Sequence, residues 1–286
     1  MPLPSRSRLL AVCAGFGFMA AAQVSATPVT SGLQLWLDAS TISAGTTSVS
    51  TWADQSGNGR NATASGLAMP TYTASNALFS GRATVSFDGN DFLSSAQASS
   101  MGITGNSSRT IFFVFSQDSS ASKNILGYGT NSGGNLFDVA ATGQRIAGHF
   151  YSSPFVGSGS SQSFTLNQMT VGTALYDGAN FETYLHDDAF SGLASSTAYA
   201  LNTGDSNFRI GGGIYSAYNN FNGDIAEVLV YSGALSAADR SAVDGYLRTK
   251  YTTAAVPEPG ALALACLGLV GVFASRRRAA ADRLKA

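Results

Sequence analysis

Residues that could do chemistry are few in this sequence of 286 residues. Retaining hydrolysis of a glycosidic bond needs two carboxyl groups about 5 Å apart, one as nucleophile and one as acid. The central part of the chain has only two glutamates, Glu182 and Glu227, and they belong to no closely spaced acidic pattern. We therefore expect a protein that is not an enzyme.

The histidines and cysteines do not favour catalysis or a metal site either. His186 precedes two aspartates, but adjacent residues of a strand point to opposite faces and form no triad by themselves. We interpret "LHDDAF" at 185–190 as a hairpin turn, and His149 as an ordinary strand residue. Cys13 and Cys266 are the only cysteines, and both lie in terminal apolar segments, so the central part has no thiol for a disulfide or a zinc site.

Oxygen-rich turns make calcium the one candidate cofactor. "WADQSGNG" at 52–59 and "FDGND" at 87–91 place side-chain and carbonyl oxygens on tight turns, and calcium prefers oxygen ligands. Aspartate and asparagine in such turns also bond their own backbone, so both interpretations stay open. The candidate ligands of a structural Ca²⁺ are Asp54, Asn58, Asp88 and Asp91.

Aromatic loop residues are the candidates for contact with a sugar. Sugar rings stack on aromatic faces while their hydroxyl groups bond to polar side chains. "IYSAYNNF" at 214–221 places aromatic residues among polar ones, and packing at the rim of the fold is the competing interpretation. The candidate ligand-binding residues are Tyr215, Tyr218 and Phe221.

Short apolar or alternating runs, separated by Gly, Asn, Asp and Ser, fill residues 31–231. This pattern is typical of an antiparallel all-β domain. "SFDGNDFL" at 86–93 and "LYDGANFE" at 175–182 provide the positive φ angles of tight hairpins. Two stacked sheets are the simplest closure, with a barrel as the alternative. The clearest strands are predicted at 33–37, 83–87, 110–116, 145–151, 170–176, 181–185, 207–211 and 225–231.

One helix is predicted inside the body, in "LSAADRSAVDGYLRTKY" at 235–251. Ser236 can cap its N-terminus, with Asp239 three residues further on. The apolar residues of the helix share one face, so we expect the helix to pack against the β-structure. These residues are Val243, Tyr246 and Leu247.

Charge is unevenly distributed along the chain. The two ends hold seven of the 16 Lys and Arg residues, so residues 27–255 carry 15 acids against nine bases. A mildly acidic surface repels a phosphate backbone, whose binding depends on clustered Lys and Arg. We therefore expect no nucleic acid partner.

Residues 1–26 have the three consecutive features of a secretory signal peptide. Arg6 and Arg8 give a basic start, an apolar run extends from Leu9 to Ala22, and the small-residue pattern Val24-Ser25-Ala26 follows. We expect signal peptidase to cleave after this pattern.

A second apolar segment lies near the C-terminus, at residues 260–275. It is slightly shorter than the roughly 17–25 residues of a spanning helix, so it crosses a membrane only where the bilayer thins or its flanks help. The basic tail 276–286 starts with Arg276, Arg277 and Arg278, a stop that keeps this end in the cytoplasm. We expect a transmembrane helix, with the body on the periplasmic side of the inner membrane.

Four segments resemble landmark segments of a known family, in the expected order. They are similar to those of the LamG-like, concanavalin A-like lectin/glucanase jelly rolls of bacterial exported proteins. The resemblance implies an all-β, antiparallel jelly-roll β-sandwich at residues 27–253, with one short C-terminal helix. The segments are "GLQLWLDASTI" (32–42), "VSTWADQSGNGRNAT" (49–63), "ATVSFDGNDFL" (83–93) and "FNGDIAEVLVYSGALSAADRSAVDGYLRTKY" (221–251).

The family contains sugar binders, adhesion modules, structural parts and some glycosidases, so its fold implies no single function. The glycosidases carry a Glu-x-Asp-x-x-Glu pattern on one strand, and this chain lacks it. A calcium pattern typical of the family, Gly-x-Ile-Asp-Glu, reads Gly-Asp-Ile-Ala-Glu at 223–227. Ala226 therefore removes one ligand that the resemblance would imply.

Residues 254–286 resemble the PEP-CTERM sorting signal of Gram-negative bacteria. The resemblance implies recognition by an exosortase-type enzyme, cleavage near the Pro-Glu-Pro motif, and export toward the cell surface or the extracellular polysaccharide matrix. The motif residues are Val256, Pro257, Glu258 and Pro259.

The combined expectation is an exported surface or matrix protein, without catalytic activity, that binds carbohydrate or mediates adhesion. Its expected partners are signal peptidase, an exosortase-type enzyme, the inner membrane before processing, and polysaccharide. Two alternatives stay open. One is a purely structural matrix protein without a sugar site, and the other is a divergent glycoside hydrolase.

Overall fold

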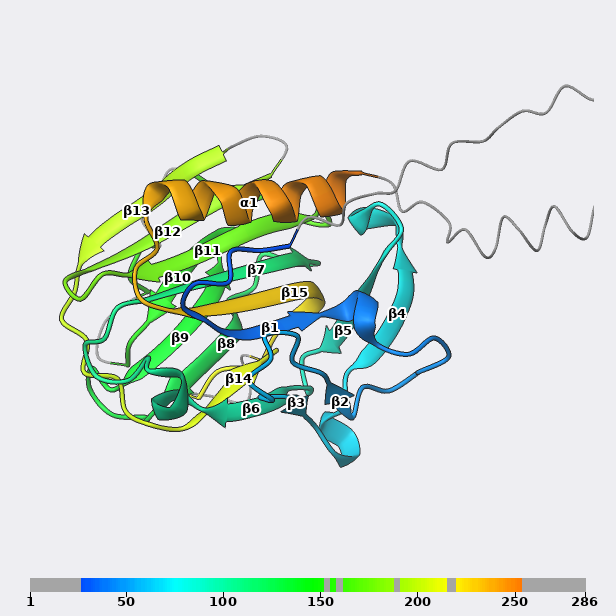
Figure 1. Ribbon diagram of the computed structural model, residues 1–286, viewed down its shortest axis with the longest axis horizontal. Coiled ribbons are helices and arrows are strands. Elements are labelled where there is room, and N and C mark those ends of the chain that lie inside the picture. Colours follow the sequence, from blue (N-terminus) through cyan, green and yellow to red (C-terminus); the bar gives the residue numbers. More distant parts are fainter. Residues whose placement is uncertain (1–26, 152–154, 158–161, 188–190, 215–219, 254–286) are drawn as a thin grey trace, which may run out of the picture.

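The computed structural model describes residues 27–151, 155–157, 162–187, 191–214 and 220–253. These residues form two antiparallel β-sheets, with a single α-helix lying along the outside of one sheet (Figure 1). The predicted all-β class with one helix is therefore confirmed, and two stacked sheets replace the barrel alternative.

Sheet A has eight strands in the order β13-β12-β11-β7-β15-β5-β4, with β1 also paired to β15. The long strand β15 pairs with β7 on one side, and with β5 and then β1 on the other. The strands are β1 (Leu33–Asp38), β4 (Thr71–Asn76), β5 (Arg82–Asp88), β7 (Arg109–Gln117), β11 (Thr170–Tyr176), β12 (Asn180–His186), β13 (Ser191–Ala198) and β15 (Asn222–Ser232).

Sheet B has seven strands in the order β10-β9-β8-β14-β6-β3-β2. Its strands are β2 (Thr51–Trp52), β3 (Ala62–Thr63), β6 (Leu93–Gln97), β8 (Lys123–Gly129), β9 (Leu136–Thr142), β10 (Arg145–His149) and β14 (Asn207–Ile210). Four short 3₁₀ turns join strands within the described residues, at η1 (Ala39–Thr41), η2 (Gly66–Ala68), η3 (Ala77–Phe79) and η4 (Ala98–Met101).

The eight predicted strands all exist, and the one predicted at 170–176 coincides with β11. The strand predicted at 145–151 ends two residues early, at His149, and Tyr151 has a left-handed φ of 72°. Strands β2, β3, β4, β6, β8, β9 and β13 were not among the predictions. They are very short, polar, or without alternation because both faces are buried.

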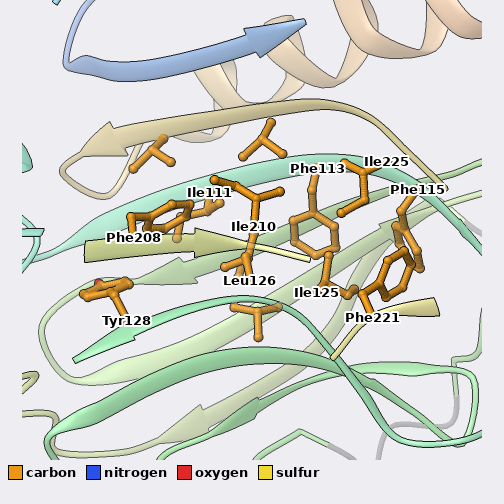
Figure 2. Packing of buried hydrophobic residues seen from close by; sticks show 14 of the residues in the cluster. Ile111, Phe113, Phe115, Ile125, Leu126, Tyr128, Phe208, Ile210, Phe221 and Ile225 are labelled. Carbon is orange, nitrogen blue, oxygen red and sulfur yellow. The ribbon is translucent and has the colours of Figure 1, made fainter. Parts of the chain in front are cut away.

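The core lies between the two sheets. Alternate residues of β7 in sheet A meet alternate residues of β8 and β14 in sheet B, as Figure 2 shows for Phe113, Leu126 and Ile210. Buried aromatic rings add edge-to-face contacts, such as the 5.1 Å separation between the ring centroids of Phe115 and Phe164. Such pairs contribute beyond the apolar area that they bury.

The helix α1 (Ala237–Thr252) packs on the outer face of sheet A (Figure 1). The Ser236 hydroxyl accepts a hydrogen bond from the Asp239 N–H at 3.1 Å, which confirms the predicted cap. Apolar residues of the helix are buried against Phe112 and Leu229 of the sheet. They are the predicted Val243, Tyr246 and Leu247, together with Tyr251.

The first described residues lie beside the last ones. Val29 packs against the same apolar cluster as Tyr251, the next-to-last residue of α1. The Tyr231 hydroxyl donates a hydrogen bond to the Val29 carbonyl at 2.9 Å. Both ends of the folded body therefore meet the outer face of sheet A.

A fully buried carboxylate lies between β15 and α1. Glu227 has no exposed surface, and burial raises its pKa, an effect that the Lys250 ammonium opposes. An unpaired charge at such a depth would be very costly. The four donors to this carboxylate are Trp36 Nε1 (2.6 Å), Lys250 Nζ (2.7 Å), Tyr246 OH (2.8 Å) and Tyr251 OH (2.9 Å).

Lys250 also bonds to Asp38 Oδ2, at 2.6 Å. The ammonium therefore joins the carboxylate at the end of β1 to the carboxylate of Glu227 on β15. We call Asp38, Glu227, Lys250 and the three aromatic donors the Glu227 cluster. It fastens the last turn of α1 to two strands of sheet A.

No helix within the described ranges has the length and apolar character needed to cross a membrane. The signal peptide predicted at 1–26 and the transmembrane helix predicted at 260–275 lie outside the described residues.

Lys250→Met should destabilise the protein strongly, because it leaves the carboxylates of Glu227 and Asp38 without their cation. Breaking a buried ion pair in this way costs about 3–5 kcal/mol. The measurement is the free energy of unfolding from urea titration at neutral pH. Arg248→Met is the control, since Arg248 is 49% exposed and lies 3.7 Å from Asp244, and an exposed pair contributes less than about 1 kcal/mol. Equal losses in both variants would contradict the structural role of the Glu227 cluster.

Candidate functional site

The outer face of sheet B carries a row of mostly polar residues across five strands. Register places His149 of β10 beside Asp138 of β9, and Asp138 beside Gly127 of β8. Gly127 is in turn paired with Arg209 of β14, which faces Ser94 of β6. Their strand neighbours fill the core, so these side chains point away from it. We call these five residues the sheet B row.

Asp138 is fully buried although it lies on an outer face. The segment 211–214 covers it, and the Ile214 N–H donates to both of its carboxylate oxygens, at 3.0 and 3.2 Å. Glycine is needed around this carboxylate, because a Cβ on Gly127 or Gly213 would overlap Asp138. Asp138 thus anchors the connection from β14 to β15 onto sheet B.

A buried amide lies beside this anchor. Asn124 is 2% exposed, and its Nδ2 has no hydrogen-bond partner within the described part of the chain. The same Nδ2 points at Gly213, where a Cβ would collide with it. Leaving a buried donor unsatisfied costs about 1–3 kcal/mol, so this amide is suited to the oxygen atom of a buried water molecule.

Two half-buried aromatic rings flank the sheet B row. The Arg209 guanidinium lies 4.7 Å from the ring centroid of Phe92, and its Nη1 donates to the Gly213 carbonyl at 3.1 Å. The imidazole of His149 lies 5.1 Å from the Phe155 ring, and burial lowers the pKa of His149, so it is neutral at pH 7. The surface combines donors, a neutral imidazole and aromatic faces.

The aromatic residues predicted to bind a ligand have different outcomes. Tyr215 and Tyr218 lie outside the described residues. Phe221 is fully buried and packs against Phe87 and Phe115, with ring centroids 6.4 and 6.2 Å away. This corrects the expectation that Phe221 contacts a ligand, because the ring belongs to the core between the sheets.

The turn at 52–61 is held by its own hydrogen bonds. Asp54 accepts from the backbone N–H groups of Trp36 (3.0 Å), Ser56 (2.9 Å) and Arg60 (2.9 Å). Burial raises the pKa of Asp54, but these N–H donors outweigh that effect and hold it below its ordinary value. Asn58 donates from Nδ2 to two carbonyl groups of β1. The turn thereby binds itself to β1.

The turn between β5 and β6 shows the same self-bonding. Asp88 accepts from the Asn90 N–H at 2.9 Å, and Asp91 accepts from the Asp88 N–H at 3.2 Å. Burial raises the pKa of Asp91, and the negative charge of Asp88 adds to this shift. Across the described ranges, no three His, Cys, Asp or Glu residues gather closely enough to hold a metal ion. Calcium at Asp54, Asn58, Asp88 and Asp91 stays a prediction.

The two glutamates of the body lie in separate settings. Glu227 belongs to its buried cluster under α1. Glu182, on β12, accepts hydrogen bonds from the hydroxyl groups of Tyr184 (2.6 Å) and Ser196 (3.3 Å). The carboxyl groups thus have different partners, on different strands.

Sequence reasoning missed Asp138, Asn124 and Arg209. A signal was present for two of them, since "LFDVAAT" (136–142) holds one acid among apolar residues, and "FRIGGG" (208–213) holds one base before three glycines. Neither signal could be used, because the strand that holds Asp138 was not predicted, and the neighbours of the strand predicted at 207–211, which holds Arg209, were unknown.

One family model matches the chain, at its C-terminal end. The PEP-CTERM protein-sorting motif covers residues 255–278, which include the four predicted motif residues and the three adjacent arginines. The predicted sorting signal is confirmed. It implies an exported protein that is processed by an exosortase-type enzyme and reaches the cell surface or the extracellular space.

Solved structures resemble the body in fold. Trypanosoma rangeli sialidase in complex with sialic acid is 16% identical, with a TM-score of 0.52, and the match covers 78% of this chain and 33% of that one. A GH54 α-L-arabinofuranosidase soaked with a cyclic sulfate inhibitor is 14% identical, with a TM-score of 0.53 and coverage of 71% and 51%. The chain thus spans about a third to half of these proteins, and the likeness shows the fold alone. The sequence has no significant match among curated proteins.

Asp54→Asn should remove part of the acid sensitivity of folding. A carboxyl group with a lowered pKa stabilises the fold above its unfolded pKa, about 3.9, and this stability is lost as pH falls through the folded value. The variant should lose about 1–3 kcal/mol at pH 6, and its difference from the wild type should shrink toward pH 2. Urea unfolding between pH 2 and 6 measures this. A difference that does not depend on pH would contradict the charged role of Asp54.

Proposed function

We propose that this chain is an exported module that holds carbohydrate on the outer face of sheet B and does not cleave it. The observation that carries the proposal is the sheet B row, where the Arg209 guanidinium and the His149 imidazole lie against half-buried aromatic rings. The order of the four landmark segments supports a LamG-like, concanavalin A-like jelly roll as the family. The sorting signal supports the surface or polysaccharide matrix of a Gram-negative bacterium as the destination.

The chemistry of this face suits a sugar. Sugars offer hydroxyl groups to directed polar partners and C–H faces to aromatic rings. Arg209 supplies donors, and the neutral imidazole of His149 adds polar ring nitrogens. Phe92 and Phe155 supply partly exposed rings on either side of the sheet B row. A neutral or mildly acidic glycan is therefore the ligand class that we propose.

The same face is poorly suited to glycosidic hydrolysis. Hydrolysis needs two carboxyl groups, about 5–5.5 Å apart for retention or about 6.5–9.5 Å for inversion. The sheet B row contains one carboxylate, Asp138, and it is buried and bonded to the Ile214 N–H. Binding without cleavage is the function that these residues support best.

Arg209→Ala, His149→Ala and Phe92→Ala should each weaken glycan binding by about tenfold, which corresponds to about 1.4 kcal/mol. The probes are a glycan array and the extracellular polysaccharide purified from the host, with affinities measured by calorimetry. Arg248→Ala, on α1 at the opposite side of the sandwich, is the matched arginine control and should bind as the wild type does.

Two results would count against the sugar site. Equal weakening in the control variant would mean that the effect comes from the fold rather than from sheet B. Absence of binding to every glycan, with the protein still retained in the matrix, would support the purely structural alternative. Release of reducing sugar from the polysaccharide would support the hydrolase alternative.

The mature protein should lack the sorting signal. Intact mass of the protein from its host should fit a chain that starts near residue 27 and ends near the Pro-Glu-Pro motif. In a host without the exosortase gene, the mass of the mature protein should be larger by that of residues 256–286. A mature wild-type protein that retains this segment would contradict the processing step.

A further inference from the structure

A pocket lies on the other side of the sandwich, between α1 and the strands β12 and β13. Its volume is about 260 Å³, and its walls include Ser191, His186 and Asp244. Pockets for drug-sized ligands hold roughly 300–1,000 Å³, so this one accommodates a smaller group. It is remote from the sheet B row, and the inference below does not rest on the glycan proposal.

Three side chains in this pocket form a connected series. The Ser191 hydroxyl lies 2.6 Å from Nδ1 of His186, and Nε2 of the same ring lies 3.4 Å from Asp244 Oδ1. Ser191 is exposed, while His186 and Asp244 retain side-chain exposures of 14% and 13%. A nucleophile, a base and a carboxylate follow in the order found in serine hydrolases, although here Nδ1 of the imidazole faces the hydroxyl and Nε2 faces the carboxylate.

The surroundings indicate which nitrogen carries the proton. Asp244 Oδ1 is buried and has no hydrogen-bond partner in the described part of the chain, and His186 Nε2 lies 3.4 Å away, at ion-pair distance but outside hydrogen-bond geometry. Catalytic contacts of this kind shorten when substrate binds, so we place the N–H of His186 on Nε2, facing that oxygen. Nδ1 is then the acceptor for the Ser191 hydroxyl proton. Burial lowers the pKa of His186, so the ring is neutral and able to take a proton at pH 7.

Charge in the pocket also suits acyl transfer. Arg240, Arg248 and Thr173 line it. Arg240 is held in place by hydrogen bonds to the Leu235 carbonyl (2.7 Å) and to the Tyr184 hydroxyl (2.9 Å). Fixed positive charge near a carbonyl oxygen stabilises the negative charge that develops there during attack.

We propose that Ser191 and His186 are catalytic residues, positioned by Asp244, of a site that hydrolyses small carboxylic esters. Ser191 Oγ bonds to the acyl carbon while its proton moves to His186 Nδ1, and the proton then passes to the departing alkoxide as the ester C–O bond breaks. Water next attacks the acyl-serine, giving its proton to Nδ1 and then to Ser191 Oγ. One ester and one water yield one acid and one alcohol, without oxidation or reduction.

The test is labelling of the purified exported protein with a fluorophosphonate probe, followed by mass mapping of the adduct. The wild type should carry the adduct on Ser191. Ser191→Ala should remove it, and His186→Gln should slow labelling by at least about 100-fold, as loss of a general base does. Ser196→Ala is the matched control on the same strand and should label as the wild type does.

The pH profile separates a positioning role of Asp244 from a purely structural one. His186 is faced by Asp244 and Arg248 of α1, by Asp187 of its own segment, and by Ser191 of β13. Labelling of the wild type should rise as pH increases through the lowered pKa of His186. In Asp244→Asn the midpoint should move to lower pH, since the attraction that raises this pKa is lost, and labelling at pH 7 should fall about tenfold or more.

Three results would overturn the proposal. They are an adduct elsewhere than on Ser191, undiminished labelling of a folded His186→Gln protein, and an unchanged pH midpoint in Asp244→Asn. Near-ultraviolet circular dichroism of each variant verifies that the fold is retained. Hydrolysis of p-nitrophenyl acetate that depends on both Ser191 and His186 would support turnover beyond labelling.

Discussion

The burial of Glu227 is the constraint on which much of the structure depends. A shift in register between Ile225 and Glu227 breaks the regular alternation of β15, and both Ala226 and Glu227 meet the helix side of sheet A. A charge at this depth is tolerable only when it is fully bonded. Its donors come from β1 and from the C-terminal half of α1, so three segments that are distant in sequence are held together.

The position of α1 on sheet A determines which outer surfaces of the sandwich remain accessible to a ligand. Because α1 occupies the outer face of sheet A, a broad polar surface is left to sheet B, where Arg209 and His149 stand beside half-buried rings. The gap between α1 and the β12–β13 hairpin is a small pocket instead. One helix thus separates a surface suited to an extended ligand from a cavity suited to a short acyl group.

Much of the fold could be predicted, because the apolar runs along β7, β11 and β15 and the Asp-Gly turns are local signals. The strands β8 and β9 are buried on both faces, so they lack alternation, and Asp138 therefore could not be assigned to a face. The sequence alone suggested that Phe221 is an aromatic residue on an exposed loop. It does not show that the side chain points into the core. The proximity of Ser191, His186 and Asp244 depends on how α1 packs, which no local pattern records.

The position of the two ends has a mechanical consequence. Val29 and Tyr251 belong to one apolar cluster, so a pull applied between the ends of the folded body acts across α1 and its contacts rather than through the two sheets. The first bonds to bear such a load are that of Tyr231 to the Val29 carbonyl at one end and those of Lys250 and Tyr251 to Glu227 at the other. While the sorting tail is still held at the membrane, tension on the chain would detach α1 from sheet A before it deformed the two sheets.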